Sequence, residues 1–363
     1  MKNCEKINLL KSTIQKTAFG TVTTLIAEFE ISVKKSISFG EKTLLANYIY
    51  YKNGNYKLVY TIIGNEGNDE SFIENDGILP TLFLNPNQEN YVSIIPYHPD
   101  KKYEISVPIF NRENTELPKG NRPFVGDFIG TSKQFSIFYN VDNWSDMKPD
   151  KMLVIEFKNN IVIKKHNIKI TLPRNNKIFI DNNEIHLLAK FENVWLHRQI
   201  DEQGNMLHER KLETNQKIFK QILSLSFNKN SYLLALENGK IIIEKIDQNG
   251  KGSTIELIDI KDHFYNTWQP VKIAESTFVT KFNSEFGNGW FTIKDDKLIE
   301  LFYSKGELGY KNLVNQDVLH TENENLVISS INKTNHSSYA VIFYPMINDK
   351  SKNKKIIIFN REI

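Results

Sequence analysis

The sequence is poor in cysteine and has no long apolar run. Its one cysteine, Cys4, excludes an internal disulfide framework and favours a reducing compartment. No stretch of 18 or more apolar residues occurs, so no membrane-spanning helix is predicted. Residues 1–11 lack the uninterrupted apolar core of a signal peptide. We therefore expect a cytoplasmic protein that does not interact with membranes.

Arginine is also scarce, and neither charge dominates. Six of the 46 basic residues are arginines, and 43 acidic residues leave a formal net charge of +3. This balance disfavours nucleic acid as a partner, because nucleic-acid-binding domains carry a clear excess of basic residues. Planar arginine side chains are preferred for recognising phosphates and carboxylates, so their scarcity also disfavours an enzyme that handles anions.

Short apolar runs that alternate with polar residues dominate from about residue 22 onward. Asn, Asp, Gly, Lys and Pro separate these runs, which is typical of β-strands joined by turns. Helical periodicity is confined to 5–17 and 215–223, and the second segment also fits a strand. The clearest predicted strands are 44–51, 56–63, 91–97, 135–141, 152–157, 161–170, 184–191, 240–246, 290–293 and 354–359.

One segment of the sequence repeats with an offset of 46 residues. Leu188-Ala189 followed by Ile200-Asp201-Glu202-Gln203-Gly204 returns as Leu234-Ala235 followed by Ile246-Asp247-Gln248-Asn249-Gly250. Each copy predicts a β-meander whose tight turns use Asn or Gly, since these residues tolerate positive φ. A period of 40–50 residues with several strands per copy indicates a propeller or a related repeat fold.

With this Ile-Asp-x-x-Gly hairpin, residues 177–260 resemble the blades of bacterial β-propeller proteins. The WD, kelch and sialidase signatures are absent, so the resemblance implies an architecture and no particular activity. Weaker copies of the same pattern, which bring the total to about seven, are found at 22–64, 81–109, 123–171, 278–302 and 326–359.

We therefore predict an all-β fold, a β-propeller of about seven four-stranded antiparallel blades. The expected organisation is an N-terminal segment, 1–21, followed by a single propeller domain, 22–363. The alternative is two packed β-domains that divide near 108–123, where a polar loop contains proline and glycine.

Large aromatic residues beside Asn-rich turns are the candidate binding residues. Trp144, Trp268 and Trp290 each lie in or next to such a turn, and His263 and Tyr265 shortly precede Trp268. Aromatic side chains on loops favour binding because they bring a large rigid area and a polar tip. The alternative is that these rings pack between blades.

No residue is predicted to be catalytic, and no metal site or cofactor is expected. His186, His197 and His208 fall in one copy of the repeat, but their spacing is not that of known metal motifs. Strand alternation puts His186 on the opposite face from its two neighbours, so we interpret it as a blade-face histidine. Carboxylate pairs contributed by different blades cannot be recognised from sequence spacing.

The leading hypothesis is a non-enzymatic protein-binding β-propeller, in concrete form a bacterial intracellular immunity or antitoxin-like protein. A rigid scaffold with variable loops suits this task. Its expected partner is another protein, with neither nucleic acid nor membrane involved, and the oligomeric state is left open. The alternative is a carbohydrate-binding or glycoside-hydrolase-type propeller that uses the tryptophan-bearing loops.

Overall fold

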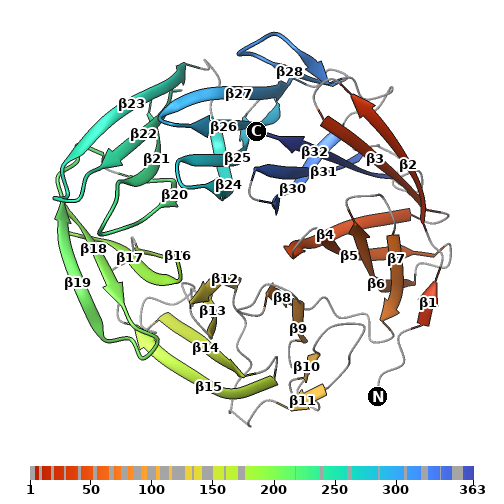
Figure 1. Ribbon diagram of the computed structural model, residues 1–363, viewed down its shortest axis with the longest axis horizontal. Coiled ribbons are helices and arrows are strands. Elements are labelled where there is room, and N and C mark those ends of the chain that lie inside the picture. The colour runs from red at the N-terminus through yellow and green to blue at the C-terminus, as the bar shows by residue number, and fades with distance from the viewer. Residues whose placement is uncertain are drawn as a thin grey trace. The chain divides into compact units, whose positions relative to one another are not determined.

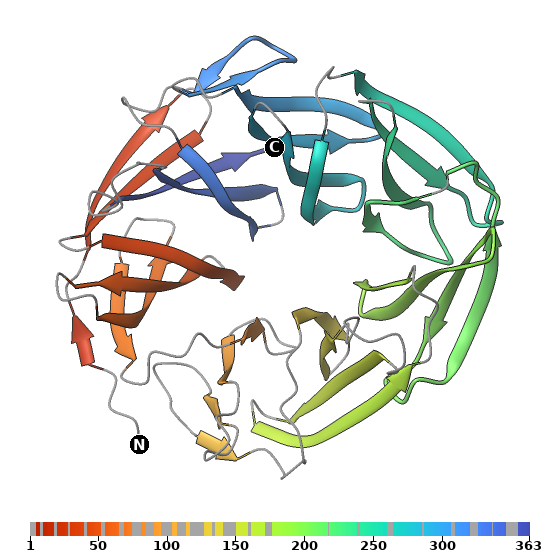
Figure 2. The ribbon, with the colours of Figure 1, turned by 180° about the vertical axis from the view of Figure 1, so that it is seen from behind.

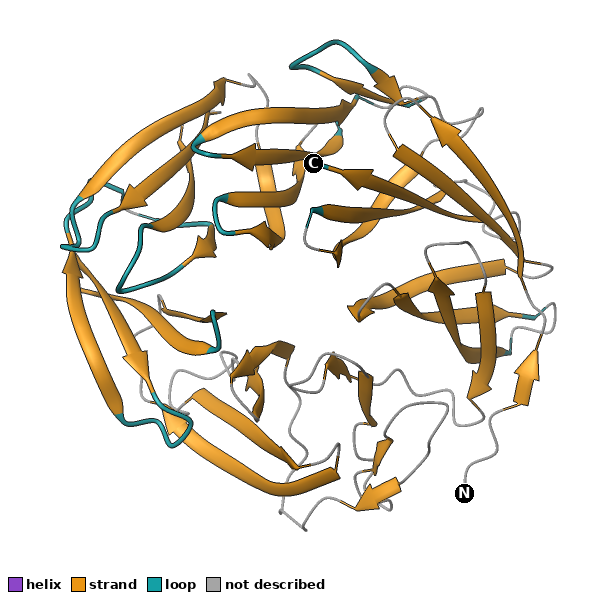
Figure 3. Cartoon of the chain, viewed as in Figure 1, coloured by secondary structure: helices purple, strands orange, loops and turns teal. Residues whose placement is uncertain are grey.

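The computed structural model consists of strands, turns and loops, and the residues that it describes include no helix (Figure 3). In the same residues, no helix is long and apolar enough to cross a membrane. The structure describes residues 5–7, 10–17, 20–27, 30–39, 42–51, 55–64, 69–74, 81–84, 91–95, 104–106, 114–116, 127–132, 135–140, 150–158, 161–170, 176–216, 218–237, 240–259, 264–284, 287–305, 309–319, 326–335, 337–345 and 355–363.

The described strands form seven antiparallel sheets of four to six strands, which confirms the predicted all-β class (Figure 1). Five sheets are meanders, in which neighbouring strands follow one another along the chain. Three meanders contain β8 (Thr81–Leu84), β9 (Tyr91–Ile95), β10 (Glu104–Ser106) and β11 (Asn114–Glu116); β12 (Asp127–Ser132), β13 (Phe135–Asn140), β14 (Asp150–Lys158) and β15 (Ile161–Ile170); and β16 (Asn176–Asp181), β17 (Glu184–Phe191), β18 (Val194–Ile200) and β19 (Met206–Leu212).

Two further meanders follow in the chain. They contain β20 (Gln221–Ser224), β21 (Ser231–Glu237), β22 (Lys240–Ile246) and β23 (Gly252–Asp259); and β24 (Phe264–Ala274), β25 (Thr277–Ser284), β26 (Asn288–Lys294), β27 (Lys297–Ser304), β28 (Tyr310–Asn312) and β29 (Val318–Leu319).

The remaining two sheets combine strands from distant parts of the sequence. One has the order β1-β7-β6-β5-β4 and the other the order β2-β3-β32-β31-β30. Their strands are β1 (Glu5–Ile7), β2 (Leu10–Thr17), β3 (Gly20–Ala27), β4 (Glu30–Phe39), β5 (Lys42–Tyr50), β6 (Tyr56–Gly64), β7 (Asp69–Glu74), β30 (Leu326–Asn335), β31 (Ser338–Pro345) and β32 (Lys355–Glu362).

The chain divides into two compact units. Unit 1 comprises Ile78–Leu233 and Glu244–Thr254 together with Met1, and unit 2 comprises Lys2–Gly77, Leu234–Ile243 and Ile255–Ile363. The division falls at 77/78 and within the sheet β20–β23, and not near 108–123, most of which lies outside the described residues. The prediction of one domain over 22–363 stays a prediction.

Residues 1–21 do not form a separate segment where the structure describes them. The short strand β1 pairs with β7, and β2 pairs with β3 over its whole length. The helical periodicity noted at 5–17 is therefore overridden by strand pairing, since a strand can satisfy its backbone groups on a neighbour in the sheet.

The turns confirm the predicted repeat. In the first copy, Asp201 Oδ1 accepts hydrogen bonds from the backbone N–H groups of Gln203 and Asn205 at 2.9 and 2.8 Å. In the second copy, Asp247 Oδ1 accepts from the residues at the same offsets, Asn249 and Lys251, at 2.9 Å each. The glycine of each turn has a φ of 89°. The same side-chain and backbone chemistry thus closes both hairpins.

Strands from the two ends of the sequence share one sheet. β3 pairs antiparallel with β32 from Thr21↔Asn360 to Ile26↔Lys355. Both ribbon views show the red N-terminal strands beside the blue C-terminal ones (Figures 1 and 2). Gly20 permits the close approach, because a Cβ at this position would lie 2.1 Å from the carbonyl oxygen of Asn360.

The core of unit 2 is built on stacked aromatic rings. Trp290 and Phe302 are fully buried and stack with ring centroids 4.5 Å apart and an interplanar angle of 11°. Phe343 in β31 meets the same indole in an edge contact at 5.7 Å, and Phe359 in β32 lies tilted against it at 6.2 Å. Rings from two sheets therefore form one apolar cluster.

A buried carboxylate joins these two sheets. Glu300 in β27 is 6% exposed, and its Oε1 accepts two hydrogen bonds from the Arg361 guanidinium in β32, the one from Nε at 2.8 Å. Its Oε2 accepts from the hydroxyls of Tyr339 and Thr292 at 3.1 and 3.3 Å. Trp290 Nε1 donates to the same tyrosine oxygen at 3.0 Å. Burial and the adjacent carboxylate raise the pKa of Tyr339.

Two lysines cross the same boundary between sheets. Lys281 Nζ in β25 donates to the backbone carbonyls of Ile328 and Ser329 in β30, at 3.1 and 2.8 Å. In return, Lys333 Nζ in β30 donates to the carbonyl of Ile273 in β24 at 2.7 Å. Burial lowers the pKa of Lys281 to about 8.

Replacing Gly20 with alanine tests the pairing of β3 with β32. The new Cβ collides with the Asn360 carbonyl, so we expect the free energy of unfolding to fall by about 1–3 kcal/mol, as in other overpacked sites. Denaturant unfolding measures this loss. Gln15→Ala, at an exposed position of β2, serves as the control and should change little. Equal stability of the two variants would contradict the close approach.

Glu300→Ala tests the buried ion pair. The substitution removes two hydrogen bonds of Arg361 and the acceptor of the Tyr339 and Thr292 hydroxyls, so we expect a loss of about 3 kcal/mol in the free energy of unfolding. Glu362→Ala, at the exposed position next to Arg361, is the matched control and should stay within about 0.5 kcal/mol of the unsubstituted protein. A small effect at Glu300 would show that the pair does not hold the sheets together.

Candidate binding surface

Three tyrosines gather at one end of the β5–β6 hairpin. Tyr48 and Tyr50 are two residues apart in β5, so both side chains leave the same face of the strand. Tyr56 begins β6 and pairs directly with Tyr50. The ring centroids are 4.9 Å apart for Tyr48 and Tyr56, 6.1 Å for Tyr50 and Tyr56, and 6.4 Å for Tyr48 and Tyr50. We call these three residues the tyrosine cluster.

The cluster combines an exposed ring with a buried base. Tyr56 exposes 51% of its surface, whereas Tyr48 and Tyr50 are partly buried. Leu58, which pairs with Tyr48, is fully buried, and so is Ile49 between the two tyrosines of β5. Because the rings rest on paired strands, they offer contact area that loses little conformational freedom on binding.

A carboxylate lies beside the rings. Glu30, at the start of β4, is the direct cross-strand partner of Tyr50. Burial, followed by the negative charge of Glu30 and the neighbouring Tyr56, raises the pKa of the Tyr50 hydroxyl. The phenol therefore stays protonated at neutral pH, and the surface presents aromatic rings next to a carboxylate.

The tyrosine cluster does not include the residues predicted from the sequence. Trp144 and His263 lie outside the described residues. Tyr265 and Trp268 belong to β24, and their side chains are also outside what the structure describes. For these four residues the binding role stays a prediction.

Trp290 is placed in the core, which corrects its prediction as a surface binding residue. The side chain is 0% exposed, and its indole N–H is bonded within the Glu300 network. The Asn288-Gly289-Trp290 sequence resembles a turn but begins β26. Gly289 is required there because a Cβ would lie 2.1 Å from the Phe302 carbonyl oxygen. For this residue, the packing alternative is the one that the structure shows.

The two histidines in the strands of the repeat meet in unit 1. His186 Nδ1 and His197 Nε2 are 3.0 Å apart, and both side chains are fully buried. Phe227 stacks on the His197 ring, with centroids 4.2 Å apart, and the exposed His208 lies near the same phenylalanine. Within the described residues, no group of three His, Cys, Asp or Glu side chains could hold a metal ion.

Arg210 fixes the protonation of this pair. Its Nε donates to His197 Nδ1, so His197 carries its hydrogen on Nε2 and donates it to His186. Burial, His186 and the Arg210 charge lower the pKa of His197 to about 2.

Arg210 itself is saturated with hydrogen bonds. Its five N–H groups have five acceptors at 2.6–3.1 Å, namely His197 Nδ1, the carbonyl oxygens of Ser226, Asp247 and Gln248, and Ser231 Oγ. Binding an anion here would require breaking one of these bonds, so the cluster is structural.

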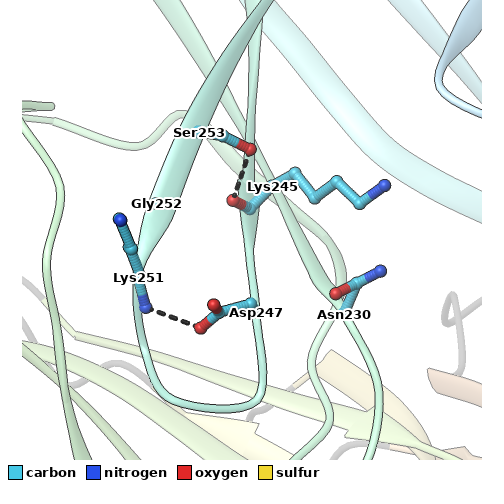
Figure 4. Close-up of a pocket in the computed structure, with 6 residues that line it drawn as sticks. All are labelled: Asn230, Lys245, Asp247, Lys251, Gly252 and Ser253. Carbon is cyan, nitrogen blue, oxygen red and sulfur yellow. Dashed lines mark hydrogen bonds between the residues drawn. The ribbon is translucent and has the colours of Figure 1, made fainter.

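A small polar pocket adjoins the same turn. It measures about 140 Å³ and is lined by Asn230, Lys245, Asp247, Lys251, Gly252 and Ser253 (Figure 4). The bonds drawn there close the hairpin: Asp247 accepts from the Lys251 N–H at 2.9 Å, and Ser253 donates to the Lys245 carbonyl at 3.4 Å. Sites for drug-sized ligands span about 300–1,000 Å³, so this pocket is too small to be one.

The tyrosine cluster was not predicted from the sequence, since the criterion for a binding residue was an aromatic side chain beside an Asn-rich turn. A signal was present: Tyr48, Tyr50, Tyr51 and Tyr56 occur within nine residues and flank the predicted turn between two strands. Period-two spacing places Tyr48 and Tyr50 on one face and Tyr51 on the other. Which face stays exposed depends on the packing of the neighbouring sheet, which is not encoded locally.

Comparison with known proteins identifies the fold. The β-propeller domain of the trilobed protease from Pyrococcus furiosus, a domain with an open velcro topology, is similar with a TM-score of 0.55 and 11% identity; the match covers 92% of this chain and 98% of that one. The chain has a β-propeller fold. A structure from a study of two prolyl endopeptidases is similar to this propeller with a TM-score of 0.52 and 11% identity, over 95% of this chain and 54% of the other, so the propeller spans about half of that protein.

No family model matches the sequence. No curated protein matches it either. At 11% identity, the likeness to the two solved structures shows the fold alone.

His197 predicts that stability falls in acid. The unfolded histidine titrates near pH 6.5 and the folded one near 2, so only the unfolded chain gains this proton as the pH falls below 6.5. The stability that the neutral His197 contributes is present well above pH 6.5 and falls as the pH drops through this value. Between pH 7.5 and 5.5 the free energy of unfolding should decrease by about 1.4 kcal/mol.

Denaturant unfolding of the protein and of His197→Gln at both pH values measures this loss. The variant should show the smaller pH effect, by about 1.4 kcal/mol, even if it is less stable at both pH values. His208→Gln, which removes the exposed histidine, should keep the original dependence. An unchanged pH dependence in His197→Gln would show that the buried ring titrates normally.

Proposed function

We propose that this chain is a non-enzymatic, seven-bladed β-propeller that binds a protein partner through the tyrosine cluster. The seven sheets support the blade number. The observation that carries the proposal is the half-exposed Tyr56 held against Tyr48 and Tyr50 on paired strands. Tyrosine is enriched among the residues that dominate binding energy in protein interfaces, and rigid presentation lowers the entropic cost.

In its concrete form, the proposal is a bacterial cytoplasmic protein of the immunity or antitoxin kind, which covers a surface of its target. The single cysteine and the nearly balanced charge favour this form over an exported or nucleic-acid-binding protein. The peptidase activity named for the similar prolyl endopeptidases is not proposed for this chain, because the likeness rests on fold alone.

The carbohydrate-binding alternative receives less support from the same rings. Their planes meet at 48–70°, so the cluster presents edges and tilted faces instead of one flat platform for a sugar ring. A glycan array with the intact protein distinguishes the two: binding lost on substitution of Tyr50 and Tyr56 would favour the carbohydrate alternative.

The test of the proposed function is capture from a lysate of the native cells followed by quantitative mass spectrometry. A partner retained in stoichiometric amount by the unsubstituted protein should be lost with Tyr50→Ala/Tyr56→Ala. Truncating interface hot spots costs roughly 2 kcal/mol or more, so its affinity should fall about 30-fold or more. Ile14→Ala, which shortens a side chain 47% exposed elsewhere in unit 2, is the control and should retain the partner.

Unfolding curves of the three proteins confirm that each variant is folded. A partner held equally by the tyrosine variant and the control would overturn the assignment of the surface. The absence of any stoichiometric partner would overturn the protein-binding function.

A further inference from the structure

The charged residues nearest the tyrosine cluster on its face of the sheet are acidic. Strand alternation and the cross-strand pairs put positions 30, 32, 48, 50, 56 and 58 on one face of β4–β6. In the two cross-strand rows that hold the tyrosines, the charged residues are Glu30, paired with Tyr50, and Glu74 of β7, paired with Leu58. The basic residue Lys35 belongs to the next row, opposite Ala46. A partner group that fits this face is therefore positively charged.

The rings leave no cage for a cation between them. Their centroids are 4.9–6.4 Å apart in T-shaped or tilted pairs, so the rings contact one another directly and no space is left between them. A small ammonium group cannot enter the cluster, and a ligand must lie against its outer surface. A flat cation meets this requirement better, because a guanidinium stacks on an aromatic face and forks onto a carboxylate at the same time.

The chain makes the same arrangement within itself. The Arg198 guanidinium lies over the Phe191 ring at 4.8 Å, while its Nε donates to Glu209 Oε2 at 2.5 Å. A ring in β17 and a carboxylate in β19, the strands on either side of Arg198, together hold its guanidinium. Tyr50 and Glu30 also offer a ring and a carboxylate, here on directly paired positions of adjacent strands.

From this geometry we infer that the tyrosine cluster and Glu30 receive an arginine side chain of the protein partner, its guanidinium lying on the tyrosine rings and bonded to the carboxylate. The inference rests on the proposed function and specifies the chemistry of the partner. Recognition then depends on both the ring surface and the charge, and neither suffices alone.

The experiment titrates the intact protein, labelled with ¹³C in its tyrosine rings, with N-acetyl-arginine methylamide and with the citrulline analogue, its neutral counterpart. Signals of the cluster are assigned through Tyr48→Phe, Tyr50→Phe and Tyr56→Phe. We expect the arginine probe to shift the cluster signals and the citrulline probe to bind at least 5-fold more weakly. Glu30→Gln should weaken arginine binding by a similar factor, whereas Glu362→Gln, the same charge change at an exposed position of β32, should not.

Equal binding of the two probes, no effect of Glu30→Gln, or no shift at the cluster would each overturn the arginine inference. These results leave the proposed function testable on its own. If the lysate partner still depends on Tyr50 and Tyr56 while the arginine probe does not bind, the surface binds protein by other chemistry and only the inference fails. If the partner ignores both tyrosines, the proposed surface fails whatever the probe does.

Discussion

The packing of unit 2 depends on how Glu300 is held. A carboxylate that is 6% exposed would destabilise the fold if it were left without partners, and here four hydrogen bonds reach it from Arg361, Tyr339 and Thr292. Arg361 lies in β32, the strand that also carries the backbone pairing to β3. Through Arg361 and Tyr339, Glu300 therefore connects the sheet β24–β29 to the sheet shared by the two ends of the sequence, next to the aromatic core.

Polar side chains make further connections between elements of the fold. Arg210 spans from β19 to the turn after β22, and Lys281 spans from β25 to β30, each donating to backbone carbonyls. Stacked apolar faces alone can slide, whereas a side chain bonded to particular carbonyls has one register. In unit 2, the hydroxyls of Ser36 in β4 and Ser330 in β30 lie 2.6 Å apart and join the sheet of the tyrosine cluster to its neighbour. This link supports the cluster, because a surface that binds without reorganising requires a rigid base.

Much of the fold could be predicted because strand alternation and turn chemistry are local. The turns after Ile200 and Ile246 use the same aspartate bonds in both copies, and the strand 184–191 has the predicted bounds. Trp290 could not be placed, because its Asn-Gly neighbours indicate a turn, whereas its ring is covered by Phe343 and Phe359 from β31 and β32, strands distant in sequence. The tyrosine cluster escaped prediction for the related reason that exposure of one strand face is decided by a neighbouring sheet.

The pairing of β3 with β32 has a consequence for how the chain is made. One edge of β3 pairs with β2. The other edge has no partner until residues 355–362, more than 300 positions later in the sequence, leave the ribosome. During synthesis, β3 and its partner β2 form an incomplete sheet whose open edge could pair with other chains. Completion of this sheet is a late, long-range step, so the edge of β3 stays open for most of the synthesis of the chain.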